Sequence, residues 1–281
     1  MKYIWRKNAG AKWLRKPGES LASRFGALLA VIERPGATRA TIQVSCKTQG
    51  EARDLVREFG GSIGRLRPDW LQEFAKQTRT KPLRIGSRLV ILRTFEKAAA
   101  SSSASGARQI IIPAEAAFGT GEHATTAMCL RLLERITRGL TPGWSMLDAG
   151  TGSGILAIAA SCLGAGSVLA VENDPLACAT AKRNAHANGV RKIEFSTSNV
   201  LTLRLTGKFD FITANLFSEI LIEALPVWSR HLVRDGRLIL SGILRSQEST
   251  VVRALQREGF IALELRRRGK WISVSACSQR K

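Results

Sequence analysis

The chain has 281 residues, of which 44% are hydrophobic and 23% are charged, as in a folded protein of one large or two ordinary domains. A mean hydropathy of −0.02 and the lack of a long uninterrupted apolar run argue against a membrane span. Five cysteines without a C-x-x-C pair, and only three histidines, give no sign of a disulfide framework or a metal site. We therefore expect a soluble protein of the reducing cytoplasm, with no membrane and no metal partner.

The charge balance is strongly basic, with 43 Lys and Arg against 22 Asp and Glu, a formal net charge of +21. A charge of this size favours acidic partners, because long-range attraction steers basic surfaces toward nucleic acid. Basic residues spread over a solvated surface would give the same count. Contact with nucleic acid or the ribosome and an ordinary solvated surface therefore both remain open.

Residues 1–97 read as a small α+β region. The first 16 residues are rich in Lys and Arg, and we interpret them as a basic N-terminal edge in preference to a targeting segment. Hydrophobic patterns then predict, in chain order, a strand at Thr38–Cys46, a helix at Glu51–Phe59 ended by Gly60 and Gly61, a helix at Asp69–Gln77 and a strand at Arg88–Thr94. The Ala- and Ser-rich residues 98–107 bury little area and predict a linker.

Residues 108–281 alternate short apolar runs with helical patterns, which predicts an α/β domain with a doubly wound, largely parallel sheet. The expected strands are Ser145–Asp148, Ser167–Glu172, Lys192–Ser196, Phe209–Asn215, Arg237–Ser241, Ile261–Leu265 and Trp271–Ala276. Two of the expected helices are Ala127–Ile136 and Ile155–Leu163.

A glycine loop follows the first of these strands, in the segment Asp148-Ala-Gly-Thr-Gly-Ser-Gly154. Glycine is needed where φ is positive or where a ligand must approach the backbone, so the loop can serve as a cofactor shelf. The spacing G-x-G-x-G differs from the dinucleotide fingerprint, whose third glycine would fall on Ile155. An ordinary strand-to-helix turn is the competing interpretation.

The next strand ends at Glu172, about twenty residues beyond Gly150, where doubly wound folds place a carboxylate beside the cofactor ribose. Such a carboxylate can accept hydrogen bonds from both sugar hydroxyls. Asp174, followed by Pro175, is better explained as the N-cap of a helix that Gly189 closes. We therefore assign the ligand role to Glu172 and a structural role to Asp174.

Asn215 stands at the carboxyl end of a predicted strand, the edge at which such folds bind ligands. Its side-chain carbonyl can accept a hydrogen bond from an amine, although an Asn after a strand is commonly a turn residue. Ahead of the domain's first long helix, the loop Ala117–Thr126 can act as a lid, with Thr125 or Thr126 as the helix N-cap. His123 in this loop can be a base or a structural residue, and we favour the structural role.

Together these segments resemble a known family. The glycine loop followed by an acid is similar to the class I methyltransferases, which use S-adenosylmethionine. The segments AFGTGEHATT (117–126), LDAGTGSGILAIAA (147–160), ANL (214–216) and LSGIL (240–244) resemble more narrowly the methyltransferases of ribosomal protein L-eleven, the PrmA type. The resemblance covers most of the chain and is loose over residues 1–60. It implies a doubly wound, seven-stranded class I methyltransferase (Rossmann-like) domain, preceded by a smaller α+β substrate-recognition domain.

The resemblance also implies site residues. Cofactor contacts would fall on Thr126, Gly150, Gly152, Glu172, Asn199 and Asn215, with Asn199 near the adenine and Asn215 also positioning the substrate amine. The family usually has Thr and Pro where this chain has Glu122 and Ala124, and Asp where it has Glu172. The longer Glu172 keeps the diol-binding carboxylate, whereas Glu122 adds a negative charge to the loop.

Three hypotheses for the function follow. The first is an S-adenosylmethionine-dependent transfer of methyl groups to amines of a ribosomal protein, with rRNA contact through the basic surface as a further partner. The second, motivated by the net charge of +21, is an rRNA methyltransferase on the same scaffold. The third is a non-catalytic module that senses the cofactor or binds nucleic acid. Positioned methyl transfer to an amine requires no covalent nucleophile.

Overall fold

The computed structural model describes residues 2–10, 13, 21, 24, 29–33, 39–46, 48–66, 82–93, 106–113, 121 and 123–279. The chain forms two compact units, Met1–Arg79 and Thr80–Lys281. The sequence predicts a linker at residues 98–107, whereas the two compact units divide between residues 79 and 80, so that residues 82–93 belong to the second unit. No helix in the described part of the chain has the length and apolar character needed to cross a bilayer.

In the described part of the first unit, helix α3 (Gln49–Phe59) packs on a four-stranded sheet. The sheet has the order β2-β3-β1-β4, built from β1 (Lys2–Gly10), β2 (Leu29–Glu33), β3 (Arg39–Cys46) and β4 (Ser62–Leu66). Helix α3 (Gln49–Phe59) begins after the N-cap Thr48 and ends at Gly60, whose φ of 67° suits glycine. The fully buried Trp5 donates from Nε1 to the carbonyl of Gly60 at 2.7 Å, which joins the central strand to the helix end. The basic residues Lys2, Arg6 and Lys7 near the N-terminus thus lie in strand β1 of this sheet.

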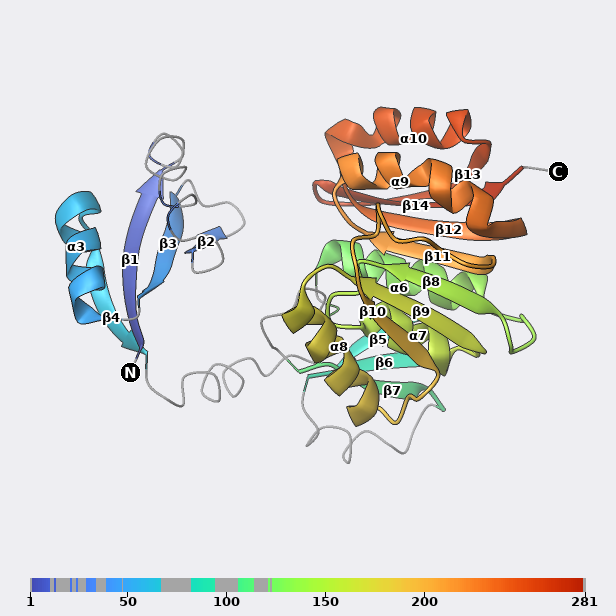
Figure 1. Cartoon of the computed structure of the whole chain (residues 1–281), viewed down its shortest axis with the longest axis horizontal. Helices are drawn as coiled ribbons and strands as arrows, with labels where there is room; N and C mark the ends of the chain where they lie inside the picture. Colours follow the sequence, from blue (N-terminus) through green and yellow to red (C-terminus); the bar gives the residue numbers. More distant parts are fainter. Residues whose placement is uncertain are drawn as a thin grey trace. The chain divides into compact units, whose positions relative to one another are not determined.

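The second unit contains a seven-stranded sheet in the order β10-β9-β8-β11-β12-β14-β13, and it confirms the predicted doubly wound domain (Figure 1). Strands β8 to β12 run parallel in the sheet, and β14 is antiparallel to both neighbours. The strands are β8 (Ser145–Ala149), β9 (Ser167–Glu172), β10 (Ile193–Thr197), β11 (Phe209–Asn215), β12 (Leu232–Leu244), β13 (Phe260–Arg268) and β14 (Trp271–Ser278).

Helices cover both faces of this sheet. They are α6 (Ala124–Ile136), α7 (Ile155–Cys162), α8 (Pro175–Ala187), α9 (Ser218–His231) and α10 (Glu248–Arg257), with a short 3-10 turn η2 (Arg245–Gln247). Successive residues of β8 point to opposite faces, so that Met146 joins the core under α6 and α7 and Leu147 joins the core under α9 and α10. Figure 1 shows α9 and α10 lying side by side over β12 to β14.

A second, three-stranded sheet belongs to the same unit, with the order β5-β6-β7. Its strands are β5 (Leu83–Ile85), β6 (Leu89–Leu92) and β7 (Arg108–Ile111), and β6 is parallel to β7. The outer side of β7 is completed by Asn188, which donates from Nδ2 to the carbonyl of Ile111 at 2.8 Å and accepts from its N–H at 2.7 Å. The predicted helix at Asp69–Gln77 lies outside the described residues.

Candidate functional site

The site predicted from the sequence lies at the carboxyl edge of the seven-stranded sheet. Strand β8 pairs with β9 on one side and with β11 on the other, so the strand order reverses at β8. Open parallel sheets bind ligands in the crevice at such a switch point. The sheet therefore brings together the residues that follow β8, β9 and β11.

The glycine turn after β8 requires its glycines. Gly150, Gly152 and Gly154 have φ values of 75°, 56° and 82°, a region that other residues rarely adopt. The N–H groups of Gly150 and Thr151 both donate to the carbonyl of Val171, at 2.8 and 2.9 Å, which ties the turn to β9. A Cβ on Gly150 would lie 2.5 Å from Cδ2 of Leu216, so a side chain at this position would require Leu216 to move. The predicted backbone geometry is confirmed.

Glu172 at the end of β9 holds the glycine turn by its carboxylate. Oε2 accepts from the N–H of Gly152 at 2.8 Å, and Oε1 accepts from the N–H groups of Asn173 and Asp174 at 2.9 and 3.1 Å. A carboxylate has about four acceptor positions, so Oε2 keeps one that is open. Asp174 caps α8 by accepting from the N–H of Leu176, as predicted, with Pro175 in the first turn.

Asp148, which is not among the predicted site residues, supports the same turn from inside the sheet. It is fully buried and accepts from the hydroxyl of Thr151 at 2.6 Å and from that of Thr213 at 2.7 Å. Burial raises its pKa to about 6, against the opposing effect of these hydrogen bonds. The sequence signal for this residue was an acid inside an apolar strand, two residues before Gly150.

Asn215 and Thr126, which are far apart in the sequence, meet at this edge. Nδ2 of Asn215 donates to Oγ1 of Thr126 at 3.2 Å, and Thr126 is almost fully buried. Donation from Nδ2 fixes the orientation of the amide and leaves Oδ1 available as an acceptor. The structure thus places two of the predicted site residues in direct contact.

The prediction that Thr125 or Thr126 caps α6 was wrong. The helix begins at Ala124 with His123 as its N-cap residue, so both threonines lie within the first turn and are buried. Nδ1 of His123 is 2.7 Å from Oγ1 of Thr125, and its ring packs edge-on against Trp271 at 5.3 Å. Burial, and then the charge of Lys270, lower the pKa of His123. These contacts support a structural role for His123; Glu122 lies outside the described residues.

Asn199 lies two residues beyond the end of β10 and is exposed. Its Oδ1 accepts from the N–H of Leu201 at 2.9 Å, which is an Asx turn. The N–H of Ser198 donates to the carbonyl of Glu172 at 2.9 Å, so this loop lies beside the end of β9. The adenine role of Asn199 remains a prediction.

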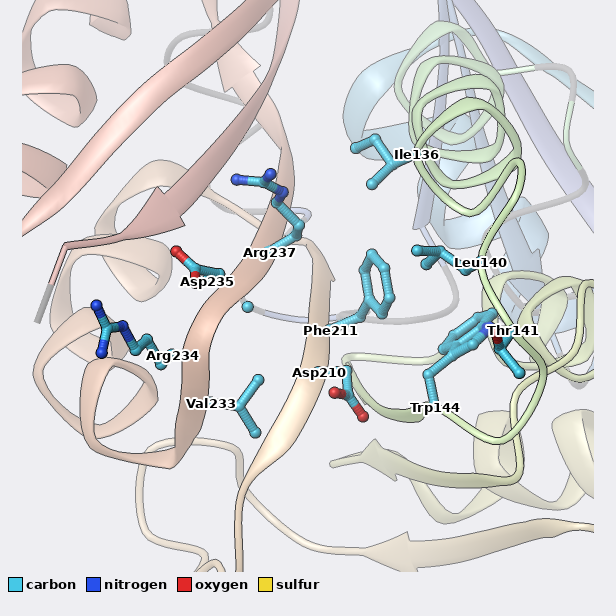
Figure 2. Close-up of a pocket in the computed structure, with 11 residues that line it drawn as sticks. Ile136, Leu140, Thr141, Trp144, Asp210, Phe211, Val233, Arg234, Asp235 and Arg237 are labelled. Atoms are coloured by element: carbon cyan, nitrogen blue, oxygen red, sulfur yellow. The ribbon is translucent and has the colours of Figure 1, made fainter. Parts of the chain in front are cut away.

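A cavity of about 480 Å³ lies at the other edge of the sheet, where β8 and β11 begin (Figure 2). Trp144 and Phe211 form part of its wall, and Figure 2 shows Leu140 facing Phe211 across it. Asp210 at this edge accepts from the N–H and the hydroxyl of Ser145, at 2.7 and 2.8 Å. This cavity contains none of the predicted site residues.

Comparison with known proteins gives the family. The family model for ribosomal protein L11 methyltransferase (PrmA) matches residues 48–279. A ribosomal protein L11 methyltransferase of Pelotomaculum thermopropionicum is 40% identical over 209 residues, which are 74% of this chain and 65% of that protein. The corresponding protein of Symbiobacterium thermophilum is 35% identical over 229 residues, 79% of this chain and 72% of the relative.

A solved structure supports the same conclusion. The ribosomal protein L11 methylase of Lactobacillus delbrueckii subsp. bulgaricus has a TM-score of 0.64 and 32% sequence identity, and the match covers 72% of this chain and all of that one. The family match includes the glycine turn, Glu172 and Asn215. The chain therefore belongs to the ribosomal protein L11 methyltransferase (PrmA) family.

Proposed function

We propose that the protein is an S-adenosylmethionine-dependent methyltransferase that transfers methyl groups to amines of ribosomal protein L11. Family membership supports this proposal, since the matched relatives carry that name. The observation that carries it is the meeting of the glycine turn, Glu172 and the Asn215–Thr126 pair at the switch point of the sheet.

The residues at this edge fit S-adenosylmethionine by their chemistry. Glu172 retains an open acceptor position on Oε2 for one ribose hydroxyl, and a second hydroxyl can replace one of the backbone N–H groups now bound to the carboxylate. Gly150 and Gly152 expose backbone that S-adenosylmethionine can approach closely. We assign further contacts with the cofactor to Thr126, Asn199 and Asn215. When bound, S-adenosylmethionine supplies the electrophilic methyl group.

The protein's part in the reaction is to position the amine and keep water out. Methyl transfer to an amine is an in-line displacement, in which correct positioning can supply roughly 7–11 kcal/mol. Oδ1 of Asn215 accepts an N–H of the substrate amine, and Thr126 holds the amide in the required orientation. A water-poor site favours the neutral amine, whose lone pair must attack the methyl carbon.

The proposal has two further parts. We place the enzyme in the cytoplasm, where its substrate is made, and we assign part of the net charge of +21 to contact with rRNA. Such contact lets a basic enzyme approach a ribosomal protein that is bound to RNA.

Two measurements test the function. Calorimetry with S-adenosylmethionine should show saturable binding, and incubation with the labelled cofactor and purified L11 should place label in the protein. Asn215→Ala should lower kcat at least tenfold while changing cofactor affinity less, because it removes the amine acceptor. No cofactor binding would refute the proposal, and label in rRNA but not in L11 would favour the rRNA methyltransferase.

A further inference from the structure

A cluster of arginines crosses from helix α6 to the edge strand β13. We call Arg131, Arg135, Arg266 and Arg268 the α6–β13 arginine cluster. Side chains alternate along a strand, so Arg266 and Arg268 share the face of β13 that looks toward α6. The residue between them, Arg267, instead binds Glu248 of α10 at 2.8 Å on the other face.

This cluster holds more positive charge than its neighbouring acid neutralises. Glu264 forms ion pairs with both Arg135 and Arg266, the latter at 2.8 Å, so one carboxylate serves two guanidinium groups. Arg131 is half-buried, and the pKa of its guanidinium is lowered by that burial and by the charges of Arg268 and Arg266. Like charges gathered in partly desolvated positions are unfavourable unless an anion joins them.

The positive charge continues to the candidate active site. Helix α6 carries Thr126 in its first turn and Arg131 in the next, and the β13–β14 hairpin brings Lys270 and Trp271 to His123 at the start of the same helix. Nζ of Lys270 lies 5.4 Å from the ring centroid of Trp271, which is partly exposed. An anionic chain bound along the cluster would therefore reach the site entrance.

We propose that the α6–β13 arginine cluster binds the phosphodiester backbone of RNA and so docks the enzyme on substrate protein that is held by RNA. This inference rests on the proposed function and assigns its rRNA contact to one surface. Guanidinium groups bind phosphate in a bidentate manner. Arg266 and Arg268, two residues apart on an extended strand, are about 7 Å apart and can contact successive phosphates.

The test is direct RNA binding by the full chain. Arg131→Gln with Arg268→Gln removes two charges without breaking an ion pair to Glu264, and Arg253→Gln with Arg257→Gln removes two exposed charges from α10 on the opposite face. The probe is a fluorescein-labelled single-stranded RNA of mixed sequence, followed by anisotropy over a range of salt. We expect the α6–β13 variant to bind about tenfold more weakly, with a salt slope lower by about 1.4, and the α10 variant to match wild type.

Equal loss in both variants, or no loss in either, would overturn the proposal. Polyglutamate that displaces the RNA from wild type at equal charge concentration would show that the surface selects acidic protein, and would also overturn it. Binding of S-adenosylmethionine by calorimetry and methylation of free L11 report on the proposed function separately. If the α6–β13 variant binds RNA as well as wild type does, or if polyglutamate displaces the RNA, while methylation of free L11 is intact, only this inference is refuted.

Discussion

Glu172 is the residue that we propose to bind the cofactor ribose. Glu172→Ala removes the carboxylate that we assign to the ribose, and charge-assisted hydrogen bonds contribute about 1.5–3 kcal/mol each. We expect affinity for S-adenosylmethionine, measured by calorimetry, to fall by at least tenfold. Glu172→Asp, which keeps the carboxylate on a shorter stem, should retain part of the affinity.

The matched control is Glu194→Ala, which removes an exposed carboxylate from the neighbouring strand β10. It should leave the affinity unchanged. A Glu172→Ala protein that melts like wild type and still binds the cofactor normally would contradict the ribose assignment.

Asp148 gives the stability a defined pH dependence. Because burial raises its pKa in the folded protein to about 6, above the value of 3.8 for a free side chain, the folded state binds this proton more tightly than the unfolded state. The associated stability is present at low pH and is lost as the pH rises through about 6, a change of about 3 kcal/mol. In Asp148→Asn this contribution is absent.

Denaturant unfolding of wild type and Asp148→Asn across about pH 4 to 8 tests this linkage. As the pH rises, the free energy of unfolding of Asp148→Asn should increase relative to that of wild type. Parallel curves for the two proteins would show that Asp148 ionises normally.

At the level of single residues, the sequence predicted the residues whose roles are determined by their neighbours in the sequence. The glycines are an example, because positive φ is a property of a local turn. The pairing of Asn215 with Thr126 could not be predicted, since it depends on how α6 packs against β11. The same is true of the hydrogen bond between Asp148 and Thr213, which lie on two different strands.

Among the elements, the hairpin of β5 and β6 holds the end of α6. Arg88 in this hairpin donates to Oε1 of Glu134 at 3.3 Å and to Oγ1 of Thr137 at 2.8 Å, while Arg138 donates to Glu134 at 2.9 Å. Glu134 is almost fully buried, and a Cβ on Gly86 would lie 2.3 Å from its carboxyl carbon. The helix that carries Thr126 is therefore fixed at its far end.

Arg88→Ala should destabilise the protein by about 2 kcal/mol, because it leaves buried Glu134 with one partner. Burial alone would raise the pKa of Glu134, but the hydrogen bonds and charges of Arg138 and Arg88 lower it. The contribution of this pair is thus present above about pH 4 and is lost as the pH falls further. Thermal or denaturant unfolding measures it, and Arg253→Ala on α10 should cost little. An equal cost at both positions would argue against the hairpin contact.

The elements that the sequence predicted well have local signals of their own. Helix α8 begins at Pro175 after its Asp174 cap, and α3 ends at Gly60. Strand β5 has three residues, too few for a periodic pattern, and its sheet depends on β7 across a long stretch of chain. This explains why residues 82–93 were assigned to the N-terminal region.

For the whole molecule, the net charge of +21 predicts how activity responds to salt. Screening weakens attraction between separated charges, with a Debye length of about 10 Å at 0.1 M salt. Methylation of L11 bound to RNA should therefore decline faster with added salt than methylation of free L11. Initial rates on the two substrates across a salt series test this, and equal decline would remove rRNA contact from the function.

The side chain of Asn188 takes the place of a neighbouring strand beside β7, because it forms hydrogen bonds with both the N–H and the carbonyl of Ile111. A strand at the border of a sheet otherwise offers these groups to another molecule, the first step of aggregation. Asn188→Ala should therefore favour self-association, visible as a larger species in light scattering at high protein concentration. The amide of Asn188 thus occupies, at Ile111, the two hydrogen-bonding groups through which another chain could extend this sheet.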